Sequence, residues 1–256
     1  VIMRGRFEGD ELISLCALEI RQSAGVAYIS GLRTREGRRR EGHGLHLTKE
    51  LMNAAKKMGV KDLRYMTSSM NVASMGLAEQ LGFSLVDEVG FYFLNTPFSP
   101  HPSPRESFKP KTVTADELYE ILRRSNLVPN KHLPYDHEFH AKTLGSLRRI
   151  GESTEFRVVS DEGGKPAALY YRNPLTERGG ETRTTYAVYC INRTIFVDMM
   201  ARIVEEAKEL GVTRAGFLMC PNGIEWVSSL GYVDSELGPW PGEYLDRRLL
   251  LYSKRL

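Results

Sequence analysis

The chain has 256 residues, of which 41% are hydrophobic and 26% charged, and its formal net charge at pH 7 is +3. This composition is typical of a globular protein with one or two cores, and a charge so close to zero argues against nucleic acid as the main partner. No apolar run approaches the ~18 residues of a membrane helix, and three widely separated cysteines indicate free thiols, so we expect a cytoplasmic protein without a membrane partner.

The first third of the chain predicts a hairpin, a third strand, a helix, a fourth strand, a short helix and closing strands. Alternating and β-branched residues predict strands over 1–7, 11–21, 24–34, 62–67 and 83–94. Apolar residues at helical spacing predict helices over 45–58 and 71–81, which Gly59 and Gly82 end. The segment between the third strand and the first helix, 35–44, is rich in arginine and glycine.

Residues 96–104 carry four prolines in nine positions. Because proline removes a backbone donor and favours extended structure, we place a linker at 97–109, between a first domain at 1–96 and a second at 110–256. In the second domain we expect helices over 115–124, 136–150, 194–210 and near 223–230. We expect strands there over 156–160, 166–172, 184–191, 213–219 and at the C-terminus.

The two halves of the chain repeat the same pattern. Residues 55–66, AKKMGVKDLRYM, match residues 207–218, AKELGVTRAGFL, and the tripeptide at 81–83 matches that at 230–232. The order of elements is common to both halves, so we interpret the chain as two copies of one fold. The segment 110–155 has no counterpart before the first hairpin. We therefore expect the first copy to lack its opening strand and helices, either because that copy is short or because the chain is a fragment.

The segment RRREGHG at 38–44 has the composition of an anion-binding loop. Glycines at a helix start allow backbone N–H groups to approach an anion closely, the helix dipole favours negative charge there, and arginines add forked donors. No Gly-Lys-Ser/Thr follows, and Leu47 stands where a dinucleotide-binding loop has its third glycine. The pattern predicts a diphosphate cradle of another kind, and a solvated arginine-rich turn is the structural alternative.

Two motifs resemble those of a known family. The stretch Arg39-Arg-Glu-Gly42-His-Gly44 is similar to the Arg/Gln-x-x-Gly-x-Gly/Ala motif of the GNAT N-acetyltransferase superfamily. The stretch NVASMGLAEQLGF at 71–83 resembles the family's Asn-x-x-Ala-x-x-Leu-Tyr-x-x-x-Gly-Phe element. The resemblance covers 1–94 directly and 110–256 through the repeat. It implies an acyltransferase that uses acetyl-CoA, with a mixed α/β (α+β) fold of two GNAT-like domains, each a mainly antiparallel, splayed sheet flanked by helices.

The same resemblance implies a donor site in a V-shaped gap between the strands at 24–34 and 62–67. Gly31 fits a bulge that opens this gap. Backbone groups of the third strand would pair with the pantetheine arm of acetyl-CoA, backbone N–H groups of the loop would hold its diphosphate, and an asparagine would contact the pantetheine or position a water. These expected cofactor-binding residues are Leu32, Arg33, Thr34, Arg39, Arg40, Glu41, Gly42, His43, Gly44, Leu45 and Asn71.

The implied reaction is direct attack of a primary amine on the thioester of acetyl-CoA, which requires a base, a donor to the thioester oxygen and an acid for the thiolate. A backbone N–H near Leu32 is the expected oxygen donor. Family members often carry a glutamate partway along this strand, where the chain has Tyr28 and Ser30, so a water relayed from either residue is the predicted base. The family's acid tyrosine is replaced by Ala78, and the thiolate must take its proton from elsewhere.

The missing glutamate and tyrosine keep a second class of function open, a non-catalytic CoA-binding module with a regulatory or structural role. A third class is a nucleic-acid- or protein-binding module that uses the arginines between 33 and 40. The glycines between these arginines and the helix favour the first two classes. The acceptor amine (a small molecule or a protein), the acyl length and the oligomeric state are open at the level of the sequence.

The second copy has lost the loop chemistry. At the offset of the repeat, Thr194 and Phe196 replace Gly42 and Gly44, and a bulky phenylalanine prevents close backbone approach to a diphosphate. We therefore expect 110–256 to be a degenerate copy without CoA binding, which covers the first copy or shapes the acceptor pocket.

Other candidate side chains predict ordinary structural roles. His137 and His140 are three residues apart on the predicted helix over 136–150, but no further ligand stands near, so we expect a solvated face and no metal. Cys190 lies in an apolar strand and is expected to be a buried, inert thiol. The expected packing aromatics are Trp226, Trp240 and Tyr244.

Overall fold

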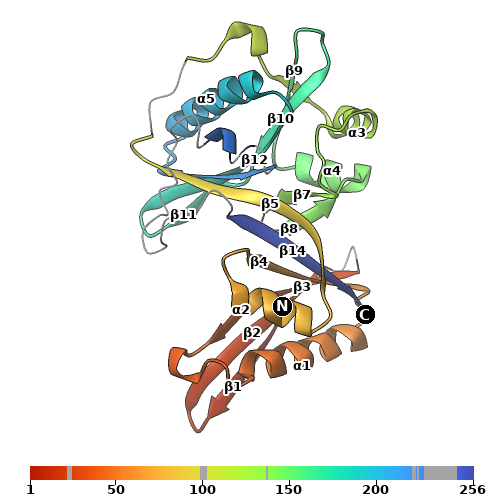
Figure 1. The fold of residues 1–256 in the computed structure, drawn as a ribbon, viewed down its shortest axis with the longest axis vertical. Coiled ribbons are helices and arrows are strands. Elements are labelled where there is room, and N and C mark those ends of the chain that lie inside the picture. Colours follow the sequence, from red (N-terminus) through yellow and green to blue (C-terminus); the bar gives the residue numbers. More distant parts are fainter. Residues whose placement is uncertain (22–24, 99–102, 137, 221–222, 224, 228–246) are drawn as a thin grey trace. The chain divides into compact units, whose positions relative to one another are not determined.

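The computed structural model describes residues 1–21, 25–98, 103–136, 138–220, 223, 225–227 and 247–256. The chain divides into two compact units (Figure 1): Val1–Glu88 together with Leu249–Leu256, and Val89–Arg248. Both are mixed α/β, with mainly antiparallel strands and flanking helices, which confirms the predicted fold class. The assignment of domains to 1–96 and 110–256, with a linker at 97–109, stays a prediction.

The first unit contains a five-stranded sheet in the order β1-β2-β3-β4-β14. Neighbouring strands are antiparallel except β3 and β4, which are parallel. The strands are β1 (Ile2–Glu8), β2 (Glu11–Arg21), β3 (Val26–Thr34), β4 (Asp62–Ser68) and β14 (Arg248–Arg255), and the first residues of β5 (Ser84–Asn95), up to Glu88, also belong to this unit. The helices are η2 (Glu36–Arg38), α1 (His43–Lys57) and α2 (Val72–Gln80).

Helix α1 packs one apolar face against the sheet of the first unit. Leu47, Leu51 and Ala55 are spaced four residues apart and are buried, as are Leu18 and Ile29 on β2 and β3, and all five belong to one core cluster. Burial of this stripe fixes the helix along β1, β2 and β3. The N-terminus of α1 therefore lies near the C-terminal end of β3.

The last strand of the chain, β14, completes the sheet of the first unit. It runs antiparallel to β4 from the pair Leu249↔Ser68 to the pair Arg255↔Asp62. Leu250 is 4% exposed and belongs to the same core cluster as α1. We expected the terminal strands within the second copy, and the structure differs because the partner of a strand is decided by tertiary pairing rather than by its own alternation.

The second unit has a sheet in the order β5-β13-β12-β10-β9-β6, with a small separate hairpin of β7 and β8. Only β12 and β13 are parallel among its described pairs. The strands are β6 (Lys111–Val113), β7 (His132–Tyr135), β8 (Glu138–Ala141), β9 (Phe156–Ser160), β10 (Pro166–Arg172), β11 (Thr176–Arg178), β12 (Glu181–Cys190) and β13 (Arg214–Met219). The helices are η3 (Glu106–Phe108), α3 (Ala115–Arg124), α4 (Leu144–Gly151) and α5 (Arg193–Glu209).

The order and directions of elements in the first unit recur in the second. The series β1, β2, β3, α1, β4 corresponds to β9, β10, β12, α5, β13, and in both the helix joins the two parallel strands. The predicted short helix near 223–230 and the match at 230–232 lie mostly outside the described residues. The repeat seen in the sequence thus corresponds to a repeated supersecondary unit over the elements that are described.

The predicted helix over 136–150 is wrong in its first half. The chain forms strand β8 there, paired with β7 through Tyr135↔Glu138, and α4 begins only after Thr143, whose hydroxyl accepts a hydrogen bond from the Ser146 N–H at 3.3 Å. Asp136 has a φ of 47°, as tight turns between antiparallel strands require. His140 consequently lies on a strand, and His137 lies outside the described residues.

Candidate active site

Strands β3 and β4 separate beyond Ile29 and Tyr65. Their parallel pairs run from Val26↔Asp62 to Ile29↔Tyr65, although β3 continues to Thr34 and β4 to Ser68. A register shift between β2 and β3 leaves one extra residue in β3 at Gly31, whose φ is 61°. Such a bulge bends the strand that carries it, which accounts for the separation. The backbone of the predicted donor-binding residues 32–34 follows this bulge.

Ser14 holds the end of β3 against β2. Its hydroxyl donates to the Arg33 carbonyl at 2.8 Å and lies 2.9 Å from the Thr34 hydroxyl. The Ser14 side chain is only 2% exposed. The strand end is thus fixed on its β2 side, while no β3–β4 pair is found past Ile29 in the described part of the chain.

Helix α1 begins without a side-chain cap. Its N-cap residue, Gly42, has a left-handed backbone with φ 83° and ψ 1°, and within the described part of the chain the helix start has no side-chain cap hydrogen bond. A Cβ added at Gly44 would lie 3.4 Å from Leu32 Cδ2, so the first helical turn packs directly on the end of β3. The open helix start and the separated strands therefore lie side by side.

Arg38 ties the loop before α1 to β1. Its guanidinium donates to both carboxylate oxygens of Glu8 at 2.6 Å and to Glu41 at 2.9 and 3.0 Å. The hydrogen bonds from Arg38 hold the pKa of both carboxyls below their ordinary values. His43 Nε2 lies 3.0 Å from Glu41, and its Nδ1 is buried without a hydrogen-bond partner among the described residues.

The other arginines of the loop differ in their pairing. Arg35 forms an ion pair with Glu11, and Arg39 lies 4.0 Å from Glu36. Arg40 is exposed and has a φ of 68°, an uncommon conformation for a residue with a side chain. Carboxylates thus offset much of the positive charge of this cluster.

The two predicted base candidates have different partners. Ser30 Oγ lies 2.5 Å from Glu19 Oε1 on β2 and donates to it. The Tyr28 hydroxyl accepts from Arg64 Nη1 at 3.1 Å, and Arg64 Nε in turn donates to Asp62 at 2.8 Å. Ser30 is therefore coupled to a carboxylate, whereas Tyr28 is coupled to a guanidinium.

Comparison with family models identifies the first unit. Residues 2–83 match the model of the acetyltransferase (GNAT) family. This segment is a GNAT domain. The match spans the β3–β4 gap and the loop before α1, so both features belong to the GNAT domain. A comparison with curated proteins gives no match.

Solved structures share the fold over nearly the whole chain. A GCN5-related N-acetyltransferase from Sphaerobacter thermophilus has a TM-score of 0.56 and 13% identity over 96% of this chain and 78% of its own. A tandem GNAT protein from the clavulanic acid biosynthesis pathway, solved without AcCoA, has a TM-score of 0.53 and 14% identity over 97% of this chain and 81% of its own. These identities are low, and what the three chains share is the fold.

Two further positions of the GNAT domain have structural roles. The Asn71 side-chain oxygen accepts from the Ser74 N–H at 3.1 Å and so caps α2. Ala78, at the position where the family motif has tyrosine, is 1% exposed in the core. The Tyr65 hydroxyl, on β4, lies 2.5 Å from Ser74 Oγ, and burial raises the pKa of Tyr65 above its ordinary value.

The corresponding helix of the second unit starts differently from that of the GNAT domain. The Asn192 side chain accepts from the N–H groups of Thr194 and Ile195 at 2.9 and 3.2 Å, and so occupies the first turn of α5. Strands β12 and β13 stay paired as far as Met219, the last residue of β13. Phe196 is 1% exposed in the core. Among the described residues, neither the open helix start nor the gap of the GNAT domain recurs here.

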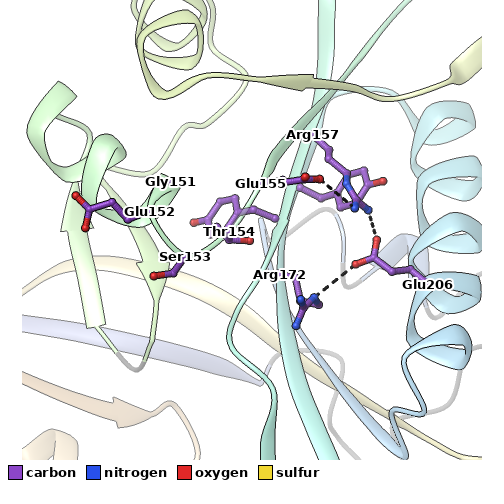
Figure 2. Close-up of a pocket in the computed structure, with 10 residues that line it drawn as sticks. Gly151, Glu152, Ser153, Thr154, Glu155, Arg157, Arg172 and Glu206 are labelled. Carbon is purple, nitrogen blue, oxygen red and sulfur yellow. Dashed lines mark hydrogen bonds and ion pairs between the residues drawn. The ribbon is translucent and has the colours of Figure 1, made fainter.

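The second unit contains a polar pocket of about 470 Å³ between α4, β9, β10 and α5. Figure 2 shows Glu206 joined to two arginines, Arg157 and Arg172, and Arg157 also lies 3.4 Å from Glu155. The Arg172 Nε–Glu206 Oε1 distance is 3.6 Å. These charges neutralise one another within the pocket, as in a structural ion-pair network.

The described part of the chain lacks two other features, a helix that could cross a membrane and a cluster of metal ligands. No helix there combines the length and apolar composition that crossing a membrane requires. No group of three or more His, Cys, Asp or Glu side chains is placed to hold a metal ion among the same residues.

Proposed function

We propose that this chain transfers an acetyl group from acetyl-CoA to a primary amine, with the donor bound by its GNAT domain. One observation carries the proposal: the first backbone N–H groups of α1 have no side-chain cap and lie beside separated strands, whereas Asn192 fills the matching place in α5. Exposed N–H groups at the positive end of a helix are suited to a diphosphate.

The residues present fit such a donor. The loop from Arg39 to Leu45 would hold the diphosphate through its N–H groups, with Arg39 and Arg40 exposed beside it. The β3 backbone at Leu32, Arg33 and Thr34 would pair with the pantetheine arm, as one strand pairs with another. Asn71 would contact the same arm, in addition to capping α2.

The chemistry requires the amine nitrogen to attack the thioester carbon while a backbone N–H near Leu32 donates to the thioester oxygen. Removal of one such donor typically costs ~10²–10³-fold in rate. Ala78 cannot supply a proton to the departing thiolate. A CoA thiolate needs little assistance to leave, since thiols are much more acidic than amines.

Thiol release from acetyl-CoA tests this function directly. The full chain is incubated with acetyl-CoA and a panel of primary amines (spermidine, kanamycin and a lysine-containing peptide), and free thiol is measured with a chromogenic disulfide. We expect amine-dependent release and an acetylated product of matching mass. A chain that acetyl-CoA stabilises against heat, but that releases no thiol with any amine, would instead be a CoA-binding module.

A non-catalytic CoA-binding module is the second candidate function. Ala78 favours it, because the methyl side chain of this buried residue cannot act as the acid that the family's tyrosine supplies. The second unit would then serve, as in the first proposal, as a degenerate GNAT-like copy that does not bind the donor. Its helix start, capped by Asn192, and its paired β12 and β13 support that role.

A further inference from the structure

We propose that Glu19 is the proton acceptor for the acceptor amine and that Ser30 relays the proton to it. The proposal rests on the acetyltransferase function above and assigns the base that the third strand does not itself provide. Glu19 lies on β2, outside both sequence motifs, and its link to the reaction comes from the 2.5 Å contact with Ser30.

Ser30 lies at the start of the gap between β3 and β4, where the thioester is expected. Ile29 is the last residue of β3 paired with β4, and Gly31 is the site of the bulge, so Ser30 lies at the point where the two strands separate. A thioester that enters between the strands would reach this point with its reacting carbon. Ser30 is half-buried, so part of this residue is open to solvent.

The register of β2 and β3 places Glu19 and Ser30 on one face. Ala17 pairs with Ser30 and Glu19 pairs with Tyr28, so Glu19 is the diagonal neighbour of Ser30. The alternate residues Leu18 and Ile29 point to the other face, into the core with α1. The hydroxyl and the carboxylate therefore lie on the face away from α1, and the Glu19 side chain is 35% exposed there.

Tyr28 is unsuited to the same role. Its hydroxyl already accepts a hydrogen bond from the Arg64 guanidinium, and a positive charge in contact opposes protonation. Glu19 also has a cation near it, since Arg21 Nη2 lies 3.6 Å from Oε2, but Oε1 is the oxygen that Ser30 contacts. The carboxylate is thus oriented with one oxygen toward the site.

The acceptor amine gives up two protons during the reaction. The acceptor enters as an ammonium ion and loses one proton to Ser30 Oγ, while the Ser30 proton passes to Glu19 Oε1. The nitrogen lone pair then forms the C–N bond, the C–S bond breaks and its electron pair leaves on sulfur. The second ammonium proton neutralises the thiolate, and Glu19 later returns its proton to water.

The test compares Glu19→Gln with the wild-type chain by the rate of thiol release with acetyl-CoA and the best amine of the panel, between pH 6 and 10. We expect kcat/KM to fall by ~10²–10⁴-fold near pH 7, as for loss of a general base. In the variant, kcat/KM should rise about tenfold per pH unit up to the pKa of the amine, because only amine that is already neutral can react. The Kd for acetyl-CoA should stay within about twofold, because Glu19 does not touch the diphosphate loop.

Three controls complete the design. Glu50 lies on α1, and its side chain is 47% exposed. Glu50→Gln should therefore leave the rate and its pH profile unchanged. Ser30→Thr should retain activity, whereas Ser30→Ala should lose at least about tenfold. The double variant should be no slower than Glu19→Gln, since groups that act as one unit are not additive.

A Glu19→Gln chain with wild-type kcat/KM and pH profile would overturn the proposal while leaving the acetyltransferase function standing. Rate losses that simply multiply in the double variant would overturn the relay through Ser30. A wild-type chain that binds no acetyl-CoA, or releases no thiol, would remove the proposed function and this inference with it.

Discussion

Gly42 and Glu41 together determine what the start of α1 can bind. A carboxylate near a helix N-terminus is attracted by the helix dipole and would compete with a bound anion. Here Arg38 and His43 hold the Glu41 carboxylate instead, and Gly42 takes a left-handed backbone that directs the chain into the helix. Among the described residues, the start of α1 is thereby left without a side-chain cap, as an anion site requires.

Gly42→Ala tests whether that backbone matters for the donor, and Gly59→Ala is its matched control. Both glycines flank α1 with positive φ, 83° and 75°, and a Cβ at either meets no atom within 4 Å. Each substitution should destabilise the chain by about 1 kcal/mol through backbone strain alone. Only Gly42→Ala should also reduce the thermal stabilisation that acetyl-CoA provides.

The comparison is made by thermal melts with and without saturating acetyl-CoA. Equal losses of stabilisation in Gly42→Ala and Gly59→Ala would mean that strain, and not the loop, accounts for the effect. Undiminished stabilisation in Gly42→Ala would contradict the assignment of this loop to the diphosphate.

The sequence contains the signal for the loop but not for Glu19. Glycines, arginines and a helical pattern are local, so the open helix start could be predicted from 38–44 alone. Glu19 and Ser30 meet through the register of two strands, and alternation along 17–20 and 28–30 would have placed both on one face once that register was known. The residues of the third strand alone therefore do not point to the proposed role of Glu19, because the contact is formed across two strands.

At the level of elements, the first unit contains a strand from the far end of the chain. Strand β14 pairs with β4 in the first unit, whereas the second unit is one continuous segment, in which residues 90–95 of β5 pair with β13. The Lys254 ammonium also donates to the Leu81 carbonyl at 2.5 Å and so binds the end of α2. The stability of the GNAT domain thus depends on residues about 160 positions away from Glu88, at the far end of the sequence.

Leu250→Ala should expose this dependence. Leu250 is 4% exposed in the core of the first unit, and removal of a buried leucine side chain costs about 2–5 kcal/mol. We expect faster hydrogen exchange of the α1 amides. We also expect half of the acetyl-CoA binding to be lost at a lower urea concentration than in the wild-type chain. Arg255→Ala, an exposed residue of the same strand, should change stability by less than about 0.5 kcal/mol. Unchanged exchange of α1 in Leu250→Ala would show that β14 is dispensable for the domain.

Most strands and helices of the fold follow from their own residue patterns, whereas strand partners do not. The hairpins, α1 and α5 have clear alternation or helical spacing. The segment 138–141 is too short for its residue pattern to distinguish a strand from a helix. It forms a strand because it pairs with β7. The pairing of β14 with β4 is likewise decided by tertiary contacts, and the residues of β14 alone cannot predict it.

At the scale of the molecule, the two units have the same series of elements but different helix starts. The GNAT domain combines an uncapped α1 with strands that separate after Ile29. The second unit combines an α5 capped by Asn192 with strands paired to Met219. We therefore expect the donor to bind to the first unit, with one donor molecule per chain.

Isothermal titration of the full chain measures both the stoichiometry and the contribution of the nucleotide end of the donor, with acetyl-CoA compared with S-acetylpantetheine, which lacks the diphosphate and the adenosine 3′-phosphate. We predict one acetyl-CoA per chain and an affinity for S-acetylpantetheine at least ~100-fold weaker, since two hydrogen bonds to a charged group contribute about 3 kcal/mol or more. Equal affinities for the two compounds, or two acetyl-CoA molecules per chain, would contradict the account.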